Sequence, residues 1–153
     1  MTERKTIGAL LAAARARLDR LEPAEAWAAV EGGAVLIDTR CAELRDDTGV
    51  IPGAIPIPLS VLYWRLDPSS GYDDPRLSDL SRQVILICAH GYSSSLAAAT
   101  LRDLGFDRAT DVIGGFEAWQ TAGLPVESSA EPLPPFSSPT IPRGGTRGVK
   151  PAT

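Results

Sequence analysis

Four consecutive aliphatic residues at positions 84–87 constrain the fold of this chain more than any other feature. Polar residues flank the run, and such a run is typical of a parallel strand that is covered on both faces. Cys88 and a glycine-containing loop follow directly. Residues 94–104 then carry apolar side chains at helical spacing. The sequence therefore predicts a strand near the middle of a sheet, then a loop, then a helix.

The same alternation of helix and strand continues on either side of this unit. Residues 23–31 are predicted to form a helix with proline at its start, and residues 34–38 a buried strand. Gly105 suits the left-handed residue that ends a helix. A short strand at 111–113 and a last helix at 116–122 are expected to follow it. This order predicts an α/β fold with parallel strands.

The two ends of the chain differ from this pattern. Residues 1–20 are predicted to form an amphipathic helix, because the apolar residues at 7, 10, 11, 14, 18 and 21 share one helical face. Charged residues from Arg15 onward favour packing on the domain or on a second subunit over a targeting or membrane-surface role. Residues 127–153 carry six of the thirteen prolines and are predicted to be a disordered tail. A Pro-Leu-Pro-Pro sequence in this tail leaves a protein partner open.

Composition excludes several classes of function. The net charge of −4 argues against the broad basic surface that nucleic-acid binding needs. The sequence offers no apolar run long enough for a membrane-embedded body. Two cysteines and one histidine cannot build a zinc finger or a disulfide framework. We therefore expect a cytoplasmic protein with free thiols, no metal and a small ligand.

The loop after the central strand is the strongest candidate for chemistry. Its residues are Cys88, Ala89, His90, Gly91, Tyr92, Ser93 and Ser94. Loops at the carboxyl ends of parallel strands line the ligand crevice. Gly91 permits backbone angles that turn N–H groups inward, and the following helix start adds partial positive charge, so a thiolate at Cys88 would be favoured. From this loop alone, however, an inert cysteine that ends a buried strand is the simpler explanation.

Four separated motifs change that balance. They are Asp38-Thr39-Arg40 with Glu43, the stretch from Gly49 to Pro58, the cysteine loop, and Gly114-Gly115-Phe116-Glu117-Ala118-Trp119. In order and spacing they resemble the rhodanese homology domain across residues 21–126. The resemblance implies an α/β fold with a central, mostly parallel sheet and helices on both faces. It also implies a sulfurtransferase that needs no cofactor.

The resemblance assigns roles to individual residues. Cys88 would attack the outer sulfur of a donor such as thiosulfate, hold it as a persulfide and pass it to cyanide or a thiol, while the loop amides hold the anion. Asp38 and Arg40 would support the site through buried hydrogen bonds, with an ion pair between Arg40 and Glu43 as a further option. Arg65 is a candidate cation for the pocket. Cys41 is either an ordinary exposed cysteine or a resolving thiol.

The loop also departs from the family pattern. Many active members carry an arginine where this chain has Ser93, so the loop is nearly neutral and His90 is its one candidate cation. This favours a thiol persulfide or a protein-bound donor over thiosulfate. It also argues against a cysteine phosphatase, which needs an arginine at the end of the loop. The alternatives are a non-catalytic rhodanese-like module that binds a partner or senses oxidants, and an adaptor that works through the helix and tail.

Overall fold

Short parallel strands form the centre of the molecule. The computed structural model describes residues 3–129, and within them the strands β1 (Val35–Asp38), β2 (Ile55–Pro56), β3 (Val84–Ile87) and β4 (Thr110–Asp111) form one parallel sheet in the order β2-β1-β3-β4. The helices are α1 (Ile7–Ala16), α2 (Pro23–Glu31), α3 (Ala42–Thr48), α4 (Leu62–Leu66), α5 (Ser93–Asp103) and α6 (Gly115–Thr121), with a short 3-10 helix, η1 (Leu59–Val61), before α4.

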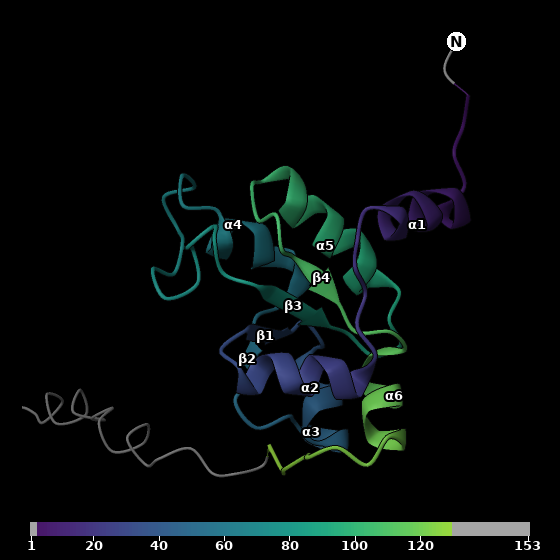
Figure 1. Ribbon diagram of the computed structural model, residues 1–153, viewed down its shortest axis with the longest axis vertical. Coiled ribbons are helices and arrows are strands. Elements are labelled where there is room, and N and C mark those ends of the chain that lie inside the picture. The colour runs from purple at the N-terminus through teal and green to yellow at the C-terminus, as the bar shows by residue number, and fades with distance from the viewer. Residues whose placement is uncertain (1–2, 130–153) are drawn as a thin grey trace, which may run out of the picture.

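Helices cover both faces of this sheet. In Figure 1, α1, α4 and α5 lie on one side of the strands, and α2, α3 and α6 lie on the other. The buried side chains form two hydrophobic cores, the first on the side of α1, α4 and α5 and the second on the side of α2 and α6. Because side chains alternate along a strand, Leu86 of β3 packs into the first core, whereas Ile85 and Ile87 pack into the second. All four residues of β3 are buried, as expected for a strand between two layers of helices. The predicted fold class is confirmed.

The parallel arrangement brings the carboxyl ends of the strands to one edge of the sheet. The loop after β3 and the Gly114-Gly115 turn after β4 meet at this edge. The contact is direct, since the Phe116 amide donates to the Cys88 carbonyl at 2.8 Å. The candidate loop therefore lies against the start of α6.

Most predicted elements are present within one or two residues of the expected positions. The helix predicted at 23–31 matches α2, and the helix predicted at 94–104 begins one residue earlier, as α5. The sequence patterns did not indicate the short helices α3 and α4. The α3 helix has no buried residue, so it lacks the apolar stripe from which a helix is predicted.

The N-terminal prediction needs correction. The helix ends at Ala16, and the next residues leave it, so that Leu21 pairs with the end of β4. The Leu21 amide donates to Asp111 O at 3.1 Å, and its carbonyl accepts from the Ile113 amide at 2.8 Å. The apolar stripe is also only partly covered, because Ile7 is 67% exposed, whereas Leu18 is buried. Helix α1 thus packs through its C-terminal half.

The start of the predicted tail is also different. Residues 127–129 are ordered: Glu127 forms an antiparallel bridge with Val50, and the Ser129 hydroxyl donates to the Arg45 carbonyl at 3.0 Å. The rest of the predicted tail, residues 130–153, lies outside the described residues.

Within the described residues, no helix combines the length and the apolar character that crossing a membrane requires.

Candidate active site

Cys88 lies at the carboxyl end of β3, directly before the loop that leads into α5. Its side chain lies among polar groups: the Gly91 amide donates to Sγ at 3.2 Å, and the thiol donates to Ser94 Oγ at 3.1 Å. The residue is only 6% exposed, so it is largely enclosed by its surroundings. The loop folds back over the sulfur, because the bond from Gly91 closes a tight turn on it.

The surroundings of Cys88 favour its thiolate. Burial by itself raises the pKa of the Cys88 thiol. Hydrogen bonds from the Ser94 and Ser93 side chains and from the Ser94 and Gly91 amides act in the opposite direction and outweigh burial. The net pKa of Cys88 is therefore lower than that of an ordinary cysteine, and a larger fraction of the sulfur is nucleophilic at neutral pH.

Amides of α6 bind two carbonyls of the loop. Cys88 O accepts from the Phe116 amide at 2.8 Å, and Ala89 O accepts from the Glu117 amide at 3.1 Å. In a trans peptide the carbonyl and the next N–H point in opposite directions. Anchoring these two carbonyls on α6 thus turns the Ala89 and His90 amides toward the other side of the loop.

Gly91 is required by both conformation and space. Its φ is +83°, in the region that side chains disfavour. A Cβ on Gly91 would lie 2.8 Å from the Gly114 amide nitrogen, which is too close for any real contact. On the other side of this contact, Gly115 has a φ of +61° and is equally enclosed by the loop backbone. The cysteine loop and the turn before α6 therefore pack backbone against backbone.

Two arginines that no local sequence pattern indicates contact the outside of the loop. Arg15 of α1 donates to Gly91 O at 2.7 Å, and Arg20 donates to the same oxygen at 3.1 Å. Both lie more than 70 positions from Gly91 in the sequence. The sequence offered His90 within the loop and Arg65 as candidate cations, and no spacing in the chain pointed to the N-terminal segment.

A buried carboxylate connects these arginines to the site. Asp111 of β4 is fully buried and forms an ion pair with Arg20, with Nε 2.8 Å from Oδ1. Asp111 Oδ2 accepts from Ser94 Oγ at 2.7 Å and from Ser95 Oγ at 2.8 Å. Since Ser94 also contacts Cys88, the structure joins Cys88, Ser94, Asp111 and Arg20 in one chain of hydrogen bonds.

Asp38 and Arg40 form a buried pair beside the site. Arg40 Nη2 lies 2.8 Å from Asp38 Oδ2, and both side chains are almost fully enclosed. Arg40 also donates to Gly49 O at 2.8 Å and stacks on the Phe116 ring at 3.7 Å. It therefore links β1, the end of α3 and the start of α6. The suggested pairing of Arg40 with Glu43 is not what the structure shows, since the carboxylate partner of Arg40 is Asp38.

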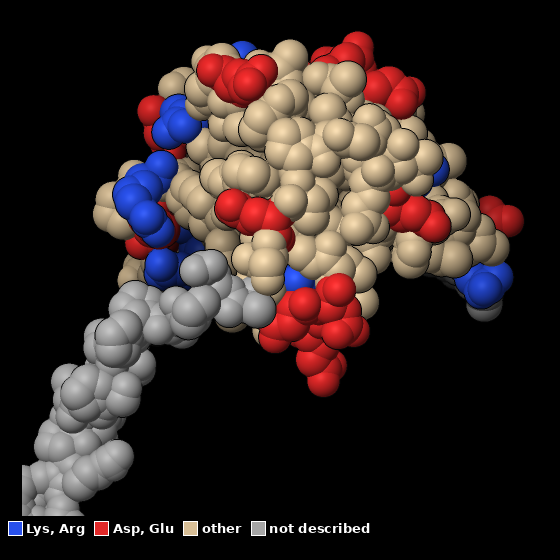
Figure 2. Space-filling view, turned by 90° about the horizontal axis from the view of Figure 1, so that it is seen from below, with Lys and Arg blue, Asp and Glu red and all other residues tan. Residues whose placement is uncertain are grey.

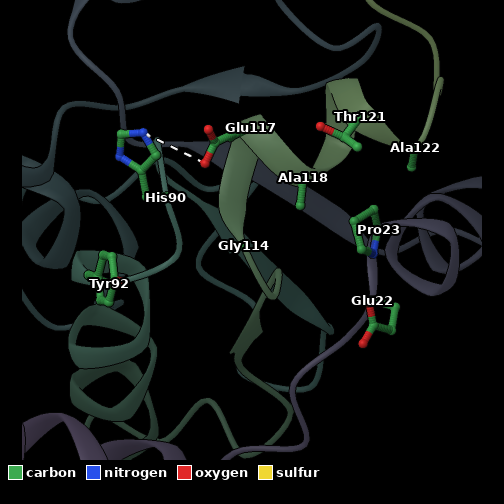
Figure 3. A pocket seen from close by; sticks show the side chains of 9 residues that line it. All are labelled: Glu22, Pro23, His90, Tyr92, Gly114, Glu117, Ala118, Thr121 and Ala122. Carbon is green, nitrogen blue, oxygen red and sulfur yellow. Dashed lines mark ion pairs between the residues drawn. The ribbon is translucent and has the colours of Figure 1, made fainter.

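Two of the cavities beside the loop have His90 in their lining. The larger, of about 640 Å³, lies between α6 and the start of α2 and is lined by Glu22, His90, Tyr92 and Glu117 among others. Figure 3 shows His90 and Tyr92 on one side of it, with His90 turned toward Glu117. The smaller, of about 250 Å³, includes Ala89 in its lining and also borders His90 and Glu117. His90 and Glu117 thus border both cavities.

Acidic side chains lie at the entrance of the larger cavity. Figure 2 views the molecule from the side that α2, α3 and α6 cover, and acidic groups are spread across that face. Glu22 and Glu117 bring carboxylates to the larger cavity itself. The His90 ring, 60% exposed, lies 4.0 Å from Glu117. An anionic donor would therefore meet a partly acidic entrance.

Two further candidates are Arg65 and Cys41. Arg65 of α4 donates to Tyr72 O at 2.7 Å and lies 3.6 Å from Asp74, and it lines neither cavity beside the loop. The expectation that Arg65 supplies charge to the pocket is therefore wrong, because its partners lie in the connection after α4. Cys41 is exposed and free at the start of α3. Among the described residues, no group of His, Cys, Asp or Glu side chains is placed to hold a metal ion.

Known proteins resemble the chain in sequence. The family model for the rhodanese-like domain matches residues 22–122. A thiosulfate sulfurtransferase GlpE from Actinobacillus succinogenes is 37% identical over 110 residues, which cover 71% of this chain and 90% of the relative. A protein of the same name from Pseudomonas syringae is 39% identical over 102 residues, covering 67% of this chain and 87% of the relative.

Solved structures resemble it as well. A protein of unknown function from Rhodopseudomonas palustris, described as a possible tyrosine phosphatase, superposes with a TM-score of 0.75 at 32% identity, over 83% of this chain and 98% of its own. The polysulfide-sulfur transferase homodimer from Wolinella succinogenes gives a TM-score of 0.62 at 23% identity, over 79% of this chain and 86% of its own. At that identity the second likeness concerns the fold alone.

Proposed function

The chain belongs to the rhodanese-like domain family, and from this premise we propose that it is a rhodanese-type sulfurtransferase in which Cys88 carries sulfur as a persulfide. The observation that supports this most strongly is the set of polar hydrogen-bonding groups around one sulfur. Gly91 and Ser94 both hydrogen-bond Cys88 Sγ, and together with Ser93 they lower its pKa. Such donors stabilise a thiolate and, equally, the terminal sulfur anion of a persulfide.

The reaction proceeds in two balanced steps. The Cys88 thiolate attacks the outer sulfur of thiosulfate and forms a new S–S bond. The bond between the two thiosulfate sulfurs breaks, and its electron pair leaves with sulfite. An acceptor thiolate or cyanide then attacks the outer persulfide sulfur, releases the Cys88 thiolate and departs as a persulfide or thiocyanate.

Thiosulfate is the first donor to test, because two relatives that share over a third of their residues with this chain carry the name thiosulfate sulfurtransferase. The loop itself offers no arginine, which favours a thiol persulfide as the second donor. A small sulfur donor and a thiol or cyanide acceptor are then the partners of the reaction, and a cytoplasmic location agrees with the free thiols. A cysteine phosphatase is less well supported, because it needs an arginine that binds the phosphate, whereas Arg15 and Arg20 hydrogen-bond the Gly91 carbonyl.

The experiment is intact mass measurement of the reduced protein after incubation with thiosulfate and, separately, with a small-molecule persulfide. We expect a gain of one sulfur atom that is lost on adding cyanide. The gain should be absent in Cys88→Ser and retained in Cys41→Ser, a matched control because Cys41 is the other cysteine of the sequence. A folded protein that gains no sulfur from either donor would be the non-catalytic binding or redox-sensing module instead. A gain that is lost in Cys41→Ser and retained in Cys88→Ser would show that Cys41, and not Cys88, carries the sulfur.

A further inference from the structure

The Gly91 carbonyl oxygen accepts hydrogen bonds from two guanidinium groups. Arg15 Nη2 lies 2.7 Å from it and Arg20 Nη2 lies 3.1 Å from it. Both arginines come from the N-terminal segment, which Figure 1 shows passing from α1, beside α5, down to α2 on the other side of the sheet. The persulfide reaction as described uses neither of them.

These arginines belong to a closed network. Arg15 Nε donates to Ser95 Oγ at 3.2 Å, and Ser95 donates to Asp111. Asp111 in turn forms two hydrogen bonds with Arg20, at 2.8 and 3.2 Å. Because each member has a partner on either side, the two guanidinium groups are fixed in place relative to the loop.

The orientation of one peptide gives this network a function. The Gly91 carbonyl shares a peptide plane with the Tyr92 amide, and the two point in opposite directions. When the arginines hold the carbonyl outward, the Tyr92 amide faces the inner side of the loop. The same anchor fixes Gly91, whose own amide bonds Cys88 Sγ at 3.2 Å. The arginines thus act on the sulfur through the backbone.

Charge provides the second part of the argument. The charge of Arg20 is balanced by Asp111. The Arg15 side chain hydrogen-bonds Gly91 O and Ser95 and lies over the Tyr92 ring, and it forms no ion pair with any carboxylate among the described residues. The other charged groups near the loop are Glu22 and Glu117 at the larger cavity and Arg40 at the smaller one, the last paired with Asp38. His90 lines both cavities and lies 4.0 Å from Glu117.

We propose that Arg15 and Arg20 are positioning residues of the sulfurtransferase site: they hold the Gly91 carbonyl from outside, which directs the loop amides at Cys88, and Arg15 brings to the loop the positive charge that its own sequence lacks. This inference rests on the proposed function. It also makes the N-terminal segment, which lies mostly outside the matched family region of residues 22–122, a part of the site.

The test measures Cys88 in two independent ways in a Cys41→Ser background, where Cys88 is the only thiol. The first is the rate of alkylation by iodoacetamide as a function of pH, and the second is kcat/KM for sulfur loading from thiosulfate. In Arg15→Gln and in Arg20→Gln we expect the alkylation midpoint to move to higher pH. We expect loading to fall about tenfold or more, since displaced donors lose their alignment. In Arg15→Lys, which keeps the charge and one donor, the alkylation midpoint should return most of the way to the wild-type pH.

Arg17→Gln is the matched control. Arg17 lies on the same segment and bonds Asp103 of α5 at 2.6 Å on the exposed surface, away from the loop. It should leave both readouts unchanged. If Arg20→Gln fails to fold, Arg15→Gln still tests the proposal, because this variant keeps the Arg20–Asp111 ion pair. The proposal is overturned if both readouts in Arg15→Gln equal those of Arg17→Gln, or if the variant loses thermal stability without a change in midpoint. A wild-type protein that takes up no sulfur would refute the proposed function, whereas the alkylation midpoints would still test the arginines.

Discussion

Ser94 has one hydroxyl hydrogen and two groups that can accept it. Its Oγ lies 2.7 Å from Asp111 Oδ2 and 3.1 Å from Cys88 Sγ. With Cys88 protonated, the thiol donates to Ser94 and Ser94 donates to Asp111. With Cys88 ionised, the hydroxyl must turn to the sulfur, and Asp111 then keeps its hydrogen bonds with Ser95 and Arg20. The proton on Cys88 and the direction of the Ser94 hydroxyl are therefore coupled.

Ser94→Ala tests this coupling. The variant lacks a hydrogen bond that lowers the pKa of Cys88, so the pH midpoint of Cys88 alkylation should rise. The alkylation rate at pH 7 should fall about tenfold, the size expected for a bond to a charged group. A lowered thiol pKa stabilises the fold fully above the unfolded value of about 8.5, and this contribution is lost as the pH falls through the lowered pKa. The difference in Tm between wild type and variant should therefore widen as the pH rises.

Ser81→Ala is the control for this measurement. Its hydroxyl donates to Asp79 at 2.7 Å on the exposed surface, which is the same kind of bond without a cysteine nearby. An unchanged alkylation midpoint in Ser94→Ala would show that the backbone amides alone set the reactivity of Cys88.

At the scale of elements, the cysteine loop is held from two directions. On one side the first amides of α6 bind the Cys88 and Ala89 carbonyls. On the other side the segment after α1 brings Arg20, and α1 brings Arg15, to the Gly91 carbonyl. The loop is thus fixed by elements from both ends of the domain, and its conformation depends on close backbone contact with the turn before α6.

Gly91→Ala should disrupt this contact. The new Cβ would meet Gly114 N at 2.8 Å, in addition to the strain of a side chain at φ +83°. Gly33→Ala is the matched control, because Gly33 has a φ of +110° but no atom within 4 Å of the place that a Cβ would take. Both variants should lose roughly 1–2 kcal/mol of stability through backbone strain. Only Gly91→Ala should lose sulfur loading by intact mass, and loading at the wild-type rate would contradict the described packing.

For the whole molecule, one sheet carries two separate cores. The first core lies under α1, α4 and α5, and the second contains Trp119, which meets Trp27 edge to face with ring centroids 5.8 Å apart. The strand β3 supplies alternate side chains to both. Since neither core exists without the sheet, the two faces should unfold together.

Trp119→Ala tests this cooperativity. Removing this fully buried side chain should cost about 3–5 kcal/mol. In urea denaturation, far-UV circular dichroism and tryptophan fluorescence should still give coincident transitions, both at lower urea than in wild type. Trp64→Phe is the control, because Trp64 on α4 is 54% exposed and its replacement should change stability by less than about 0.5 kcal/mol. Two separate transitions in Trp119→Ala would mean that the first core is stable on its own.

The sequence alone determined the family, the α/β class and the position of the cysteine loop. These features are local: the four aliphatic residues of β3, the helical spacing after them and the glycines at 114 and 115 each act within a few residues. A pattern of apolar residues is enough to predict a helix or strand, because the side chains that make up the pattern are also the ones that the element buries in the core. For this reason the predicted α2, β3 and α5 are confirmed.

Tertiary structure alone decided which charges reach the loop. Arg15, Arg20 and Asp111 come from α1, the segment after it and β4, and no spacing in the chain relates them to Cys88. The sequence pointed to Arg65 as a pocket cation, yet in the structure Arg65 hydrogen-bonds Tyr72 O in the connection after α4. Hydrogen bonds between distant segments depend on how the helices and strands pack against one another. That packing is determined by the apolar surface that the whole domain buries, and not by the residues that form the hydrogen bond.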